Sequence, residues 1–444
     1  MIQSFADRQS LLWRLGSTSF FVVTQLFLTS RFVAEPFRYL GYNERVATTT
    51  EVGFAVAASA VLAVVAPPQW RRASDSAYAF LIATVALPVL WIPVFYGPLQ
   101  QDQVAMLQLI AVAGFLAMRL TLVGERRSLR VLVVPRQLLW TILVSVVAVV
   151  LAFLVFRVGL RFEILGFAEV YDQRDFYSGR VGALGAYLPG WVGSGVLPMV
   201  IAFGLWQRHP LMVASGVTGV LVLYSLTGFK SYLIGVVLIF GAYGLAASRR
   251  PVPTDWVFWL AAAMWVAALL DRVTDNLIFT SLFVRRAIAT SGLNTAFFMD
   301  YFGRQPTYEL RHSVLSFLGE SPYPAPPARW IGLHYYESLD TAANANFLAD
   351  GLANFGVVGA LGAAVLLGLC LRGYDVLSDR LPLPVATAGL MFVLVAVSNT
   401  ALLTVLLTHG GFVAAAMAWV LAGQEHAKTQ TRRNALRSSH QSSP

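Results

Sequence analysis

The stretch Gln137–Phe156 reads QLLWTILVSVVAVVLAFLVF and contains no charged side chain. An α-helix needs about 20 consecutive apolar residues to cross the hydrocarbon core of a bilayer. The whole chain of 444 residues has a similar character, because 57% of its residues are apolar, only 12% are charged and its mean hydropathy is +0.65. Soluble domains carry about 25% charged residues. The composition therefore excludes a cytosolic enzyme and predicts an all-α, polytopic integral membrane protein.

Apolar runs of this kind recur along the chain and predict about 12 membrane-spanning helices, with about ten to 13 compatible with the pattern. They lie near residues 11–30, 48–66, 77–96, 104–123, 137–156, 185–206, 210–228, 231–248, 255–271, 347–371, 383–400 and 403–422. We expect residues 1–423 to form a single membrane domain. Residues 424–444 are polar, basic and rich in serine, which predicts a disordered cytoplasmic tail.

The short loops predict the orientation, since Lys and Arg concentrate on the cytoplasmic side of a membrane. With the N-terminus inside, the cytoplasmic segments hold Arg8, Arg14, Arg71, Arg72, Arg126, Arg127, Arg130, Arg208, Arg249, Arg250, Arg372, Arg380, Lys428, Arg432, Arg433 and Arg437. The loop 97–103 on the other side holds no basic residue. We therefore expect a multi-pass protein of the bacterial inner (plasma) membrane with both termini cytoplasmic.

Two outer, periplasmic segments, residues 157–186 and 272–345, are too long to serve only as connectors and hold many Arg, Asp and Glu residues. Function is concentrated in such loops. Within the second segment, residues 274–291 have the apolar spacing of an amphipathic helix. The cluster of prolines between residues 322 and 327 then predicts an extended or turning path.

Lys230 is one of only two lysines among the 32 basic residues, the other being Lys428 in the tail. It lies in Thr227–Ser231 at the expected outer junction of two spans. Gly228 allows a tight turn there, so that the ammonium group can face an outer cavity. The alternative is a lysine at a helix end whose ammonium group reaches the membrane surface.

Asn346, Asp350 and Asn354 recur at intervals of four residues and so share one face of a predicted helix. Asp350 falls one turn into the helix, where a carboxylate needs a partner or a water-filled cavity. The alternative is helix capping by Asn344 or Asn346, with Asp350 favoured by the positive helix N-terminus.

Aromatic and charged residues interleave in the second outer segment, as in residues 298–304 and 334–337. Such faces suit sugar rings, although a belt at the lipid headgroups uses the same residue types. His312 and His334 are candidate general bases, although a single loop histidine is often only solvent-exposed. The chain has one cysteine, Cys370, and no motif for metal or nucleotide binding, so we expect no metal and no cofactor.

Four segments together resemble the bacterial Wzy-type oligosaccharide repeat-unit polymerases, which extend O-antigen, capsule or exopolysaccharide chains outside the inner membrane. They are Arg72-Ala73-Ser74-Asp75 followed by a span with Pro88 and Pro93, Thr227-Gly228-Phe229-Lys230-Ser231, Phe298–Ser313 (FMDYFGRQPTYELRHS), and Asn344–Gly359 with its Asn-Phe-Gly-x-x-Gly end. Their order in a frame of about 12 spans carries the resemblance. Lipid-A core ligases share this frame but typically have a His-Asn pair where this chain has Ala345-Asn346, which argues against a ligase.

The resemblance implies metal-independent transfer of a glycan from undecaprenyl pyrophosphate to the non-reducing end of another lipid-linked repeat unit. Its implied partners are the undecaprenyl-pyrophosphate-linked oligosaccharide, the lipid bilayer, a chain-length regulator and a flippase, without any nucleic acid. O-antigen ligase, a lipid-linked oligosaccharide flippase or transporter, and a structural membrane scaffold are the alternatives.

The implied reaction needs cations at the pyrophosphate and a proton acceptor at the attacking hydroxyl. For pyrophosphate and glycan binding we expect Lys230, Arg180, Arg286, Arg311, Asn346, Asn354 and Tyr301, and as catalytic carboxylates Asp350, Glu337 or Asp340. Ion pairing with the acids of the same segments is the alternative role for the arginines.

Overall fold

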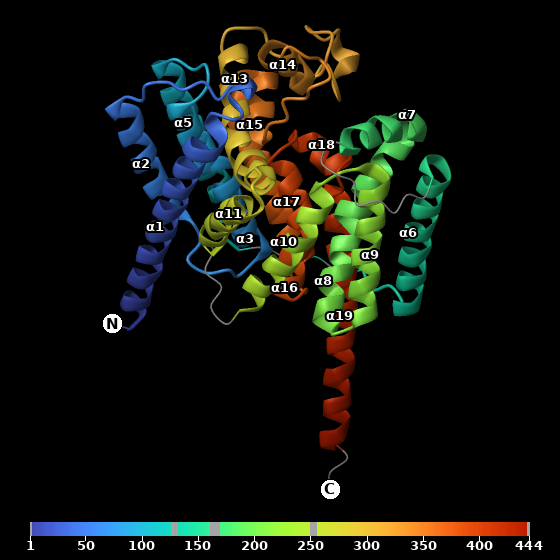
Figure 1. Cartoon of the computed structure of the whole chain (residues 1–444). Coiled ribbons are helices and arrows are strands. Elements are labelled where there is room, and N and C mark those ends of the chain that lie inside the picture. Colours follow the sequence, from blue (N-terminus) through green and yellow to red (C-terminus); the bar gives the residue numbers. More distant parts are fainter. Residues whose placement is uncertain (1, 126–128, 130–131, 160–168, 249–254, 442–444) are drawn as a thin grey trace.

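The computed structural model describes residues 2–125, 129, 132–159, 169–248 and 255–441. Within these residues every regular element is a helix (Figure 1). The only β pairing in the described part of the chain is an isolated bridge between Glu44 and Tyr96. The expectation of an all-α protein is confirmed for these residues.

The first part of the chain forms α1 (Ile2–Thr29), η1 (Ser30–Ala34), η2 (Arg38–Leu40), α2 (Thr49–Val65), α3 (Ala73–Leu81), η3 (Ile82–Ala86), α4 (Leu87–Phe95), α5 (Gln101–Leu122), α6 (Arg136–Val158), α7 (Glu169–Gly190), η4 (Trp191–Val196), α8 (Leu197–Gln207), α9 (Pro210–Thr227) and α10 (Ser231–Ala247). The second part forms α11 (Asp255–Thr274), α12 (Ile278–Thr280), η5 (Ser281–Ala289), α13 (Thr290–Phe302), η6 (Ser316–Leu318), α14 (Pro327–Tyr336), α15 (Phe347–Leu377), α16 (Leu383–Gly389), α17 (Met391–Val397), α18 (Leu402–Leu407) and α19 (Gly411–Gln441).

Among the described residues, 8 helical segments are long and apolar enough to cross a membrane. They are Gln9–Ala34, Ala73–Phe95, Gln101–Leu122, Arg136–Val158, Gly185–Gln207, Pro210–Thr227, Trp256–Thr274 and Phe347–Leu377. Three shorter apolar helices cover Thr49–Val65, Ser231–Ala247 and Leu383–Val397. These segments coincide with predicted spans, and the last predicted span falls on α18 and the start of α19. The helices are those of a polytopic membrane protein.

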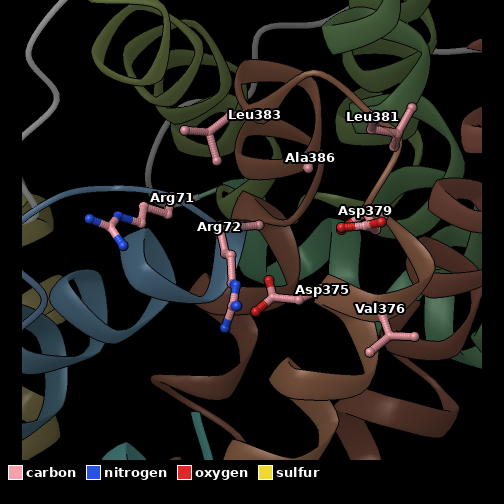
Figure 2. Close-up of a pocket in the computed structure, with 10 residues that line it drawn as sticks. Arg71, Arg72, Asp375, Val376, Asp379, Leu381, Leu383 and Ala386 are labelled. Atoms are coloured by element: carbon pink, nitrogen blue, oxygen red, sulfur yellow. The ribbon is translucent and has the colours of Figure 1, made fainter. Parts of the chain in front are cut away.

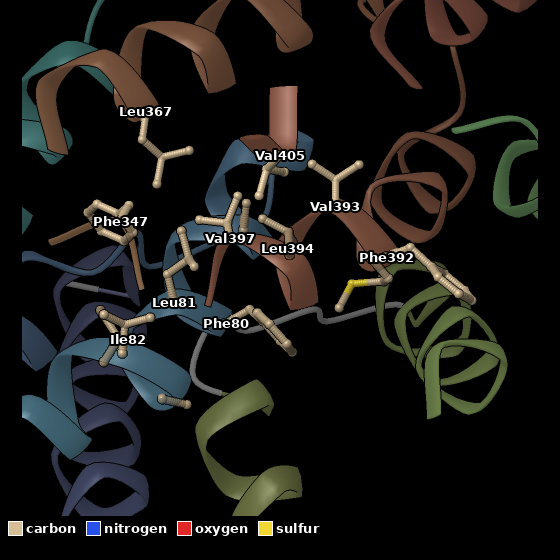
Figure 3. Close-up of a cluster of buried hydrophobic side chains, with 14 of the residues drawn as sticks. Phe80, Leu81, Ile82, Phe347, Leu367, Phe392, Val393, Leu394, Val397 and Val405 are labelled. Carbon is tan, nitrogen blue, oxygen red and sulfur yellow. The ribbon is translucent and has the colours of Figure 1, made fainter. Parts of the chain in front are cut away.

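The continuous helix formed by α3, η3 and α4 lies at the centre of the molecule. It is apolar around its circumference from Ala77 onward except for Thr84, and 94% of its most apolar window is buried. A helix that is hydrophobic all round is stable only when other helices surround it. Figure 3 shows Phe80, Leu81 and Ile82 from this helix in one buried cluster with Phe347 of α15 and residues 392–397 of α17. The chain is thus built around residues 73–95.

Arginine side chains close the helix ends on the side of the molecule where both termini lie (Figure 1). Arg14 Nη1 donates to the carbonyl oxygens of Ala63 and Val64 at 3.1 and 2.9 Å, at the end of α2. Arg372 Nη1 donates to carbonyl oxygens of residues 121 and 123 at 2.9 and 3.0 Å, at the end of α5. The last carbonyls of a helix lack partners within it, so these arginines satisfy them. Of the basic residues that predict the orientation, Arg126, Arg127, Arg130, Arg249 and Arg250 lie outside the described residues.

The two predicted outer segments contain more helix than loop. The first contributes α7, although residues 160–168 of it lie outside the described part. The second contains a continuous helical run over residues 278–302, in which every residue from Ser291 to Met299 is buried. This run includes most of the predicted amphipathic helix, and its second half, α13, packs against α4 and α15. The segment is therefore partly built into the helix bundle.

Both outer segments lie at the end of the molecule opposite the termini, where Figure 1 shows α7, α13 and α14. The C-terminal region differs from its prediction. The sequence predicted disorder from residue 424, whereas α19 continues as helix to Gln441. Residues 442–444 lie outside the described part.

Candidate functional site

The helix α15 bends sharply at Phe355 and Gly356, near the end of the molecule that carries α13 and α14. Phe355 has φ −144° and ψ 25°, and Gly356 has φ 59° and ψ −144°, a conformation that favours glycine. A Cβ atom on Gly351 would lie 2.5 Å from both the Gly359 carbonyl oxygen and the Ala360 Cα. In a straight helix, residues eight positions apart are separated by about 12 Å. The chain therefore folds back, and α15 consists of a short half (347–354) and a long half (357–377).

Asn346 caps the short half of α15. Its side-chain oxygen accepts the backbone amides of Leu348 and Ala349 at 3.0 and 3.3 Å. Its Nδ2 donates to the hydroxyls of Ser291 and Thr295 of α13 at 2.9 and 2.8 Å. The side chain is completely buried. The structure therefore shows Asn346 as a helix cap, as in the alternative above. Both the oxygen and the nitrogen of its side-chain amide bond to other parts of the protein.

Asp350 and Asn354 bond to each other one helical turn apart. Asn354 Nδ2 donates to Asp350 Oδ1 at 3.0 Å and to its carbonyl oxygen at 2.9 Å. The backbone amide of Leu402, at the start of α18, also donates to the Asp350 carboxylate. Asn354 Oδ1 accepts the backbone amide of Leu310 at 3.0 Å. Asn354 therefore connects Asp350 to the loop that follows α13.

The loop over residues 308–312 is held against the C-terminal end of the short half. The backbone amides of Tyr308 and Glu309 donate to the carbonyl oxygens of Ala353 and Asn354 at 2.9 and 3.0 Å. Glu309 and Leu310 have φ values of 51° and 58°, in the left-handed region. This conformation costs roughly 1–2 kcal/mol per non-glycine residue, so surrounding bonds must maintain it. Those bonds come from the end of the short half.

Arg311 follows these strained residues and pairs with Glu309 at 2.6 Å. The two side chains are 41% and 50% exposed, and exposed ion pairs contribute little to stability. The pair supports the ion-pairing alternative for Arg311, on a loop whose backbone is fixed.

Aromatic rings from α13, α14 and the intervening loop form a continuous group beside this loop. This aromatic cluster comprises Tyr301, Tyr308, Tyr323, Trp330 and His334. Trp330 Nε1 donates to the Tyr301 hydroxyl at 2.8 Å, and ring centroids lie 5.1 Å apart for Tyr323 and Trp330 and 4.9 Å apart for Tyr308 and Tyr323. Tyr308 is completely buried, whereas Tyr301, Tyr323 and Trp330 are half-buried and His334 is exposed. The buried ring of Tyr308 thus supports the other rings of the cluster, which are partly or fully accessible to solvent.

His312 lies at the edge of the aromatic cluster. Its ring centroid is 4.8 Å from that of Tyr308, in an edge-to-face arrangement. Its Nδ1 atom is buried and has no hydrogen-bond partner among the described residues. Burial lowers the pKa of this imidazole below its usual value, because desolvation disfavours the charged form. The ring is therefore neutral at pH 7.

The structure separates the three predicted catalytic carboxylates. Asp350 lies between the strained loop and α18, as described above. Glu337 and Asp340 are exposed and follow α14. Glu337 is the residue that ends α14, with a φ of 55°. These two carboxylates therefore lie on the surface, while Asp350 is held within the molecule.

Lys230 and Arg180 belong to another corner of the same end of the molecule. Gly228 has a φ of 68°, which confirms the tight turn before α10. Lys230 is half-buried at the start of this helix, and its neighbour Phe229 contacts Tyr177 of α7, with ring centroids 6.3 Å apart. Arg180 is exposed on α7, which packs against α9. Arg286 is exposed in the π-helical segment η5 and belongs to neither group.

The prediction from sequence included Tyr301 but missed Tyr308, Tyr323 and Trp330. The local density of aromatic residues is the signal that could have identified them. They are separated by irregular intervals and broken by prolines, so no periodicity indicates that their rings meet.

A cavity of about 120 Å³, shown in Figure 2, lies between the start of α3, the end of α15 and α16. It is lined by Arg71, Arg72, Ala73, Asp375, Val376, Ser378, Asp379, Leu381, Leu383 and Ala386. Asp375 accepts the Ser74 amide at 2.9 Å, and also the Ser74 hydroxyl, and so caps α3. Ligand pockets usually measure about 300–1,000 Å³. This cavity is too small for an oligosaccharide, and one of its two acidic residues, Asp375, caps a helix.

Within the described residues, no group of three or more His, Cys, Asp or Glu side chains is arranged to hold a metal ion. The chain matches no protein-family model, no curated protein and no solved structure.

Proposed function

We propose that this protein is an oligosaccharide repeat-unit polymerase of the bacterial inner membrane. It moves the growing glycan from undecaprenyl pyrophosphate to the non-reducing end of a new lipid-linked repeat unit. In this proposal the chain crosses the membrane about 12 times, so that both termini are cytoplasmic and the reaction takes place at the outer surface. The observation that carries the proposal is the aromatic cluster, which adjoins the strained loop that Asn354 connects to Asp350. Figure 1 shows α13 and α14, which carry much of this cluster, at the end of the molecule opposite the termini.

The aromatic cluster suits the acceptor glycan. Sugar rings present apolar faces that stack on aromatic side chains, while their hydroxyls need hydrogen-bonding groups nearby. Tyr301, Tyr323 and Trp330 are half-buried and fixed by mutual contacts, so they lose little conformational freedom when a sugar binds. Asp300 of α13 and Arg304, just beyond the end of this helix, form an ion pair at 3.7 Å and supply charged groups at the same place.

The donor side of the reaction requires cations. As the bond between the anomeric carbon and the pyrophosphate oxygen breaks, negative charge develops on the phosphate, and positioned Lys or Arg groups stabilise it. Lys230 and Arg180 in one corner, and Arg311 on the loop beside Asp350, are the proposed pyrophosphate contacts. Arg286 contributes only if the lipid-linked donor passes along η5. A chain-length regulator and a flippase act with the polymerase as partners.

Purified protein in lipid vesicles, given undecaprenyl-pyrophosphate-linked repeat units from its own host, tests the proposal. EDTA is present and no nucleotide is added. We expect wild type to produce a ladder of polymers and Trp330→Ala to lose it. Trp259→Ala is the matched control, because Trp259 is 52% exposed on a membrane-spanning helix and should leave the ladder intact.

Two outcomes would support other functions. Movement of labelled substrate across the bilayer without a ladder identifies a flippase or transporter. Transfer of a finished glycan to a lipid A core acceptor, again without a ladder, identifies a ligase. Either result contradicts the polymerase proposal.

A further inference from the structure

We propose that His312 is the proton acceptor of the glycosyl transfer. Its imidazole takes the proton from the hydroxyl of the acceptor sugar while the oxygen of that hydroxyl attacks the anomeric carbon of the donor. This inference rests on the polymerase function proposed above. It assigns a role to a histidine and removes that role from the three carboxylates expected from sequence.

Hydrogen bonds to two other segments fix the loop that carries His312. Toward α15, the residues just before it are bonded to Ala353 and Asn354. Toward the following segment, the Tyr308 hydroxyl donates to the carbonyl oxygen of Ala325 at 2.6 Å. Tyr308 is completely buried and contacts the imidazole directly. A general base must hold a fixed geometry, and this loop provides one.

The imidazole has an unusual hydrogen-bonding state. Buried polar atoms in proteins nearly always have a partner, and an exception calls for an explanation. His312 Nδ1 is buried without a partner among the described residues, and its Nε2 makes no hydrogen bond to these residues. His334 differs, because its Nδ1 lies 2.9 Å from the carbonyl oxygen of Trp330 and its side chain is exposed. Because its Nδ1 is enclosed, His312 would take a proton from a substrate through Nε2.

The surroundings keep the ring neutral. Desolvation lowers the pKa of His312 below 6.5, so the unprotonated form predominates at pH 7. The charged groups nearby are paired: Glu309 with Arg311 in the same loop at 2.6 Å, and Asp300 of α13 with Arg304 just after this helix at 3.7 Å. Asp350, which belongs to the short half of α15, accepts hydrogen bonds from Asn354 and from the Leu402 amide. These pairings limit the net charge that acts on the imidazole.

The proposed step balances without another reactant. The acceptor oxygen forms a bond to the anomeric carbon, and the bond from that carbon to the pyrophosphate oxygen breaks. The electron pair of the broken bond leaves on the pyrophosphate, and the proton of the hydroxyl moves to His312. The imidazolium ion then releases its proton to water. Asp350 acts as a positioning residue, because its bonds to Asn354 hold the end of the helix to which the loop is attached.

Rates measured between pH 5 and pH 8 in the vesicle assay test the assignment. In wild type, kcat/KM should fall as the pH drops through the pKa of His312, because the protonated ring cannot accept a proton. His312→Gln should lower kcat/KM by roughly 10²–10⁴-fold and abolish this decline. His209→Gln is the control, because His209 is exposed at the start of α9 and belongs to no proposed site, so this variant should keep both the rate and the pH profile. Imidazole added to His312→Gly should restore part of the rate.

The outcomes separate this inference from the proposed function. A wild-type ladder together with an unchanged rate and pH profile in His312→Gln overturns the role of His312 and leaves the polymerase intact. A missing wild-type ladder contradicts the polymerase itself. If His312→Gln aggregates, His312→Gly decides the question, since a purely structural histidine would give no recovery with imidazole.

Discussion

Asn354 donates to the Asp350 carboxylate across 3.0 Å and, with the oxygen of the same amide, accepts the backbone amide of Leu310. One side chain therefore holds a carboxylate in α15 and a strained loop residue that lies 44 positions earlier in the sequence. Asn354 itself is only 2% exposed. Both of its partners depend on it, because water has little access to replace it.

Replacing Asn354 with Leu should destabilise the protein by about 1–3 kcal/mol, since the Leu310 amide and Asp350 both lose a buried partner. The apparent melting temperature in detergent should fall accordingly. Asn399→Leu is the control, because Asn399 is half-buried and donates only to the carbonyl oxygen of Val395 in its own helical turn. Equal melting temperatures for the two variants would show that the hydrogen bonds of Asn354 contribute nothing to the free energy of unfolding.

Gly351→Ala should disrupt the bend in α15. The added methyl would lie 2.5 Å from the Gly359 carbonyl oxygen, and such overpacking costs about 1–3 kcal/mol. Gly362→Ala, in the long half, meets nothing within 4 Å and should be neutral or slightly stabilising, because alanine favours helix. Thermal unfolding of both variants measures the difference. A stable Gly351→Ala protein would contradict the close approach of the two halves.

Glu337→Gly should stabilise the protein by up to about 1 kcal/mol and leave polymerisation unchanged. Glu337 ends α14 with a φ of 55°, and glycine adopts this conformation without the steric cost of a side chain. The melting temperature and the polymer ladder are the two measurements. Loss of the ladder in both Glu337→Gly and Glu337→Gln would restore the catalytic role expected from sequence.

Arg14→Ala should destabilise the protein by about 1–3 kcal/mol, because it leaves carbonyl groups at the end of α2 without their donor. Arg14 is only 7% exposed. Arg31→Ala, at an exposed position on the same N-terminal helical segment, should have little effect. A comparison of denaturation midpoints in mild detergent would check both expectations, and equal midpoints would contradict the capping role.

Long apolar runs determined what the sequence could predict about the fold. The segment Gln137–Phe156 is apolar throughout and carries no charge, so the helix α6 could be predicted directly from it. The segment 272–345 was harder, because α13 is buried by other protein helices and carries polar residues such as Asn294 and Thr295. The polar residues of this segment indicated an outer loop. In the structure, α13 is instead packed among the other helices of the bundle. Hydropathy measures transfer to lipid and does not report burial against protein.

The candidate site was predictable only where its residues are close in sequence. The spacing of Asn346, Asp350 and Asn354 correctly placed them on one helix. Their partners lie in α13, α18 and the 308–312 loop. These segments are far away in the sequence, so a local sequence pattern does not predict the contacts. The bend at Gly356 was also missed, although a glycine flanked by an aromatic residue is compatible with one. The meeting of aromatic rings around Trp330 likewise depends on the path of a proline-rich segment.

The bend in α15 separates two mechanical environments within one helix. The long half is surrounded by lipid and neighbouring spans, and a change in bilayer thickness tilts such a helix. The short half is fastened to α13 through Asn346 and to the 308–312 loop through Asn354. Phe355 and Gly356 join the two halves, and Gly351 of the short half packs closely against Gly359 and Ala360 of the long half. In the polymerase proposed above, a change in membrane thickness would therefore reach the 308–312 loop through this packed bend.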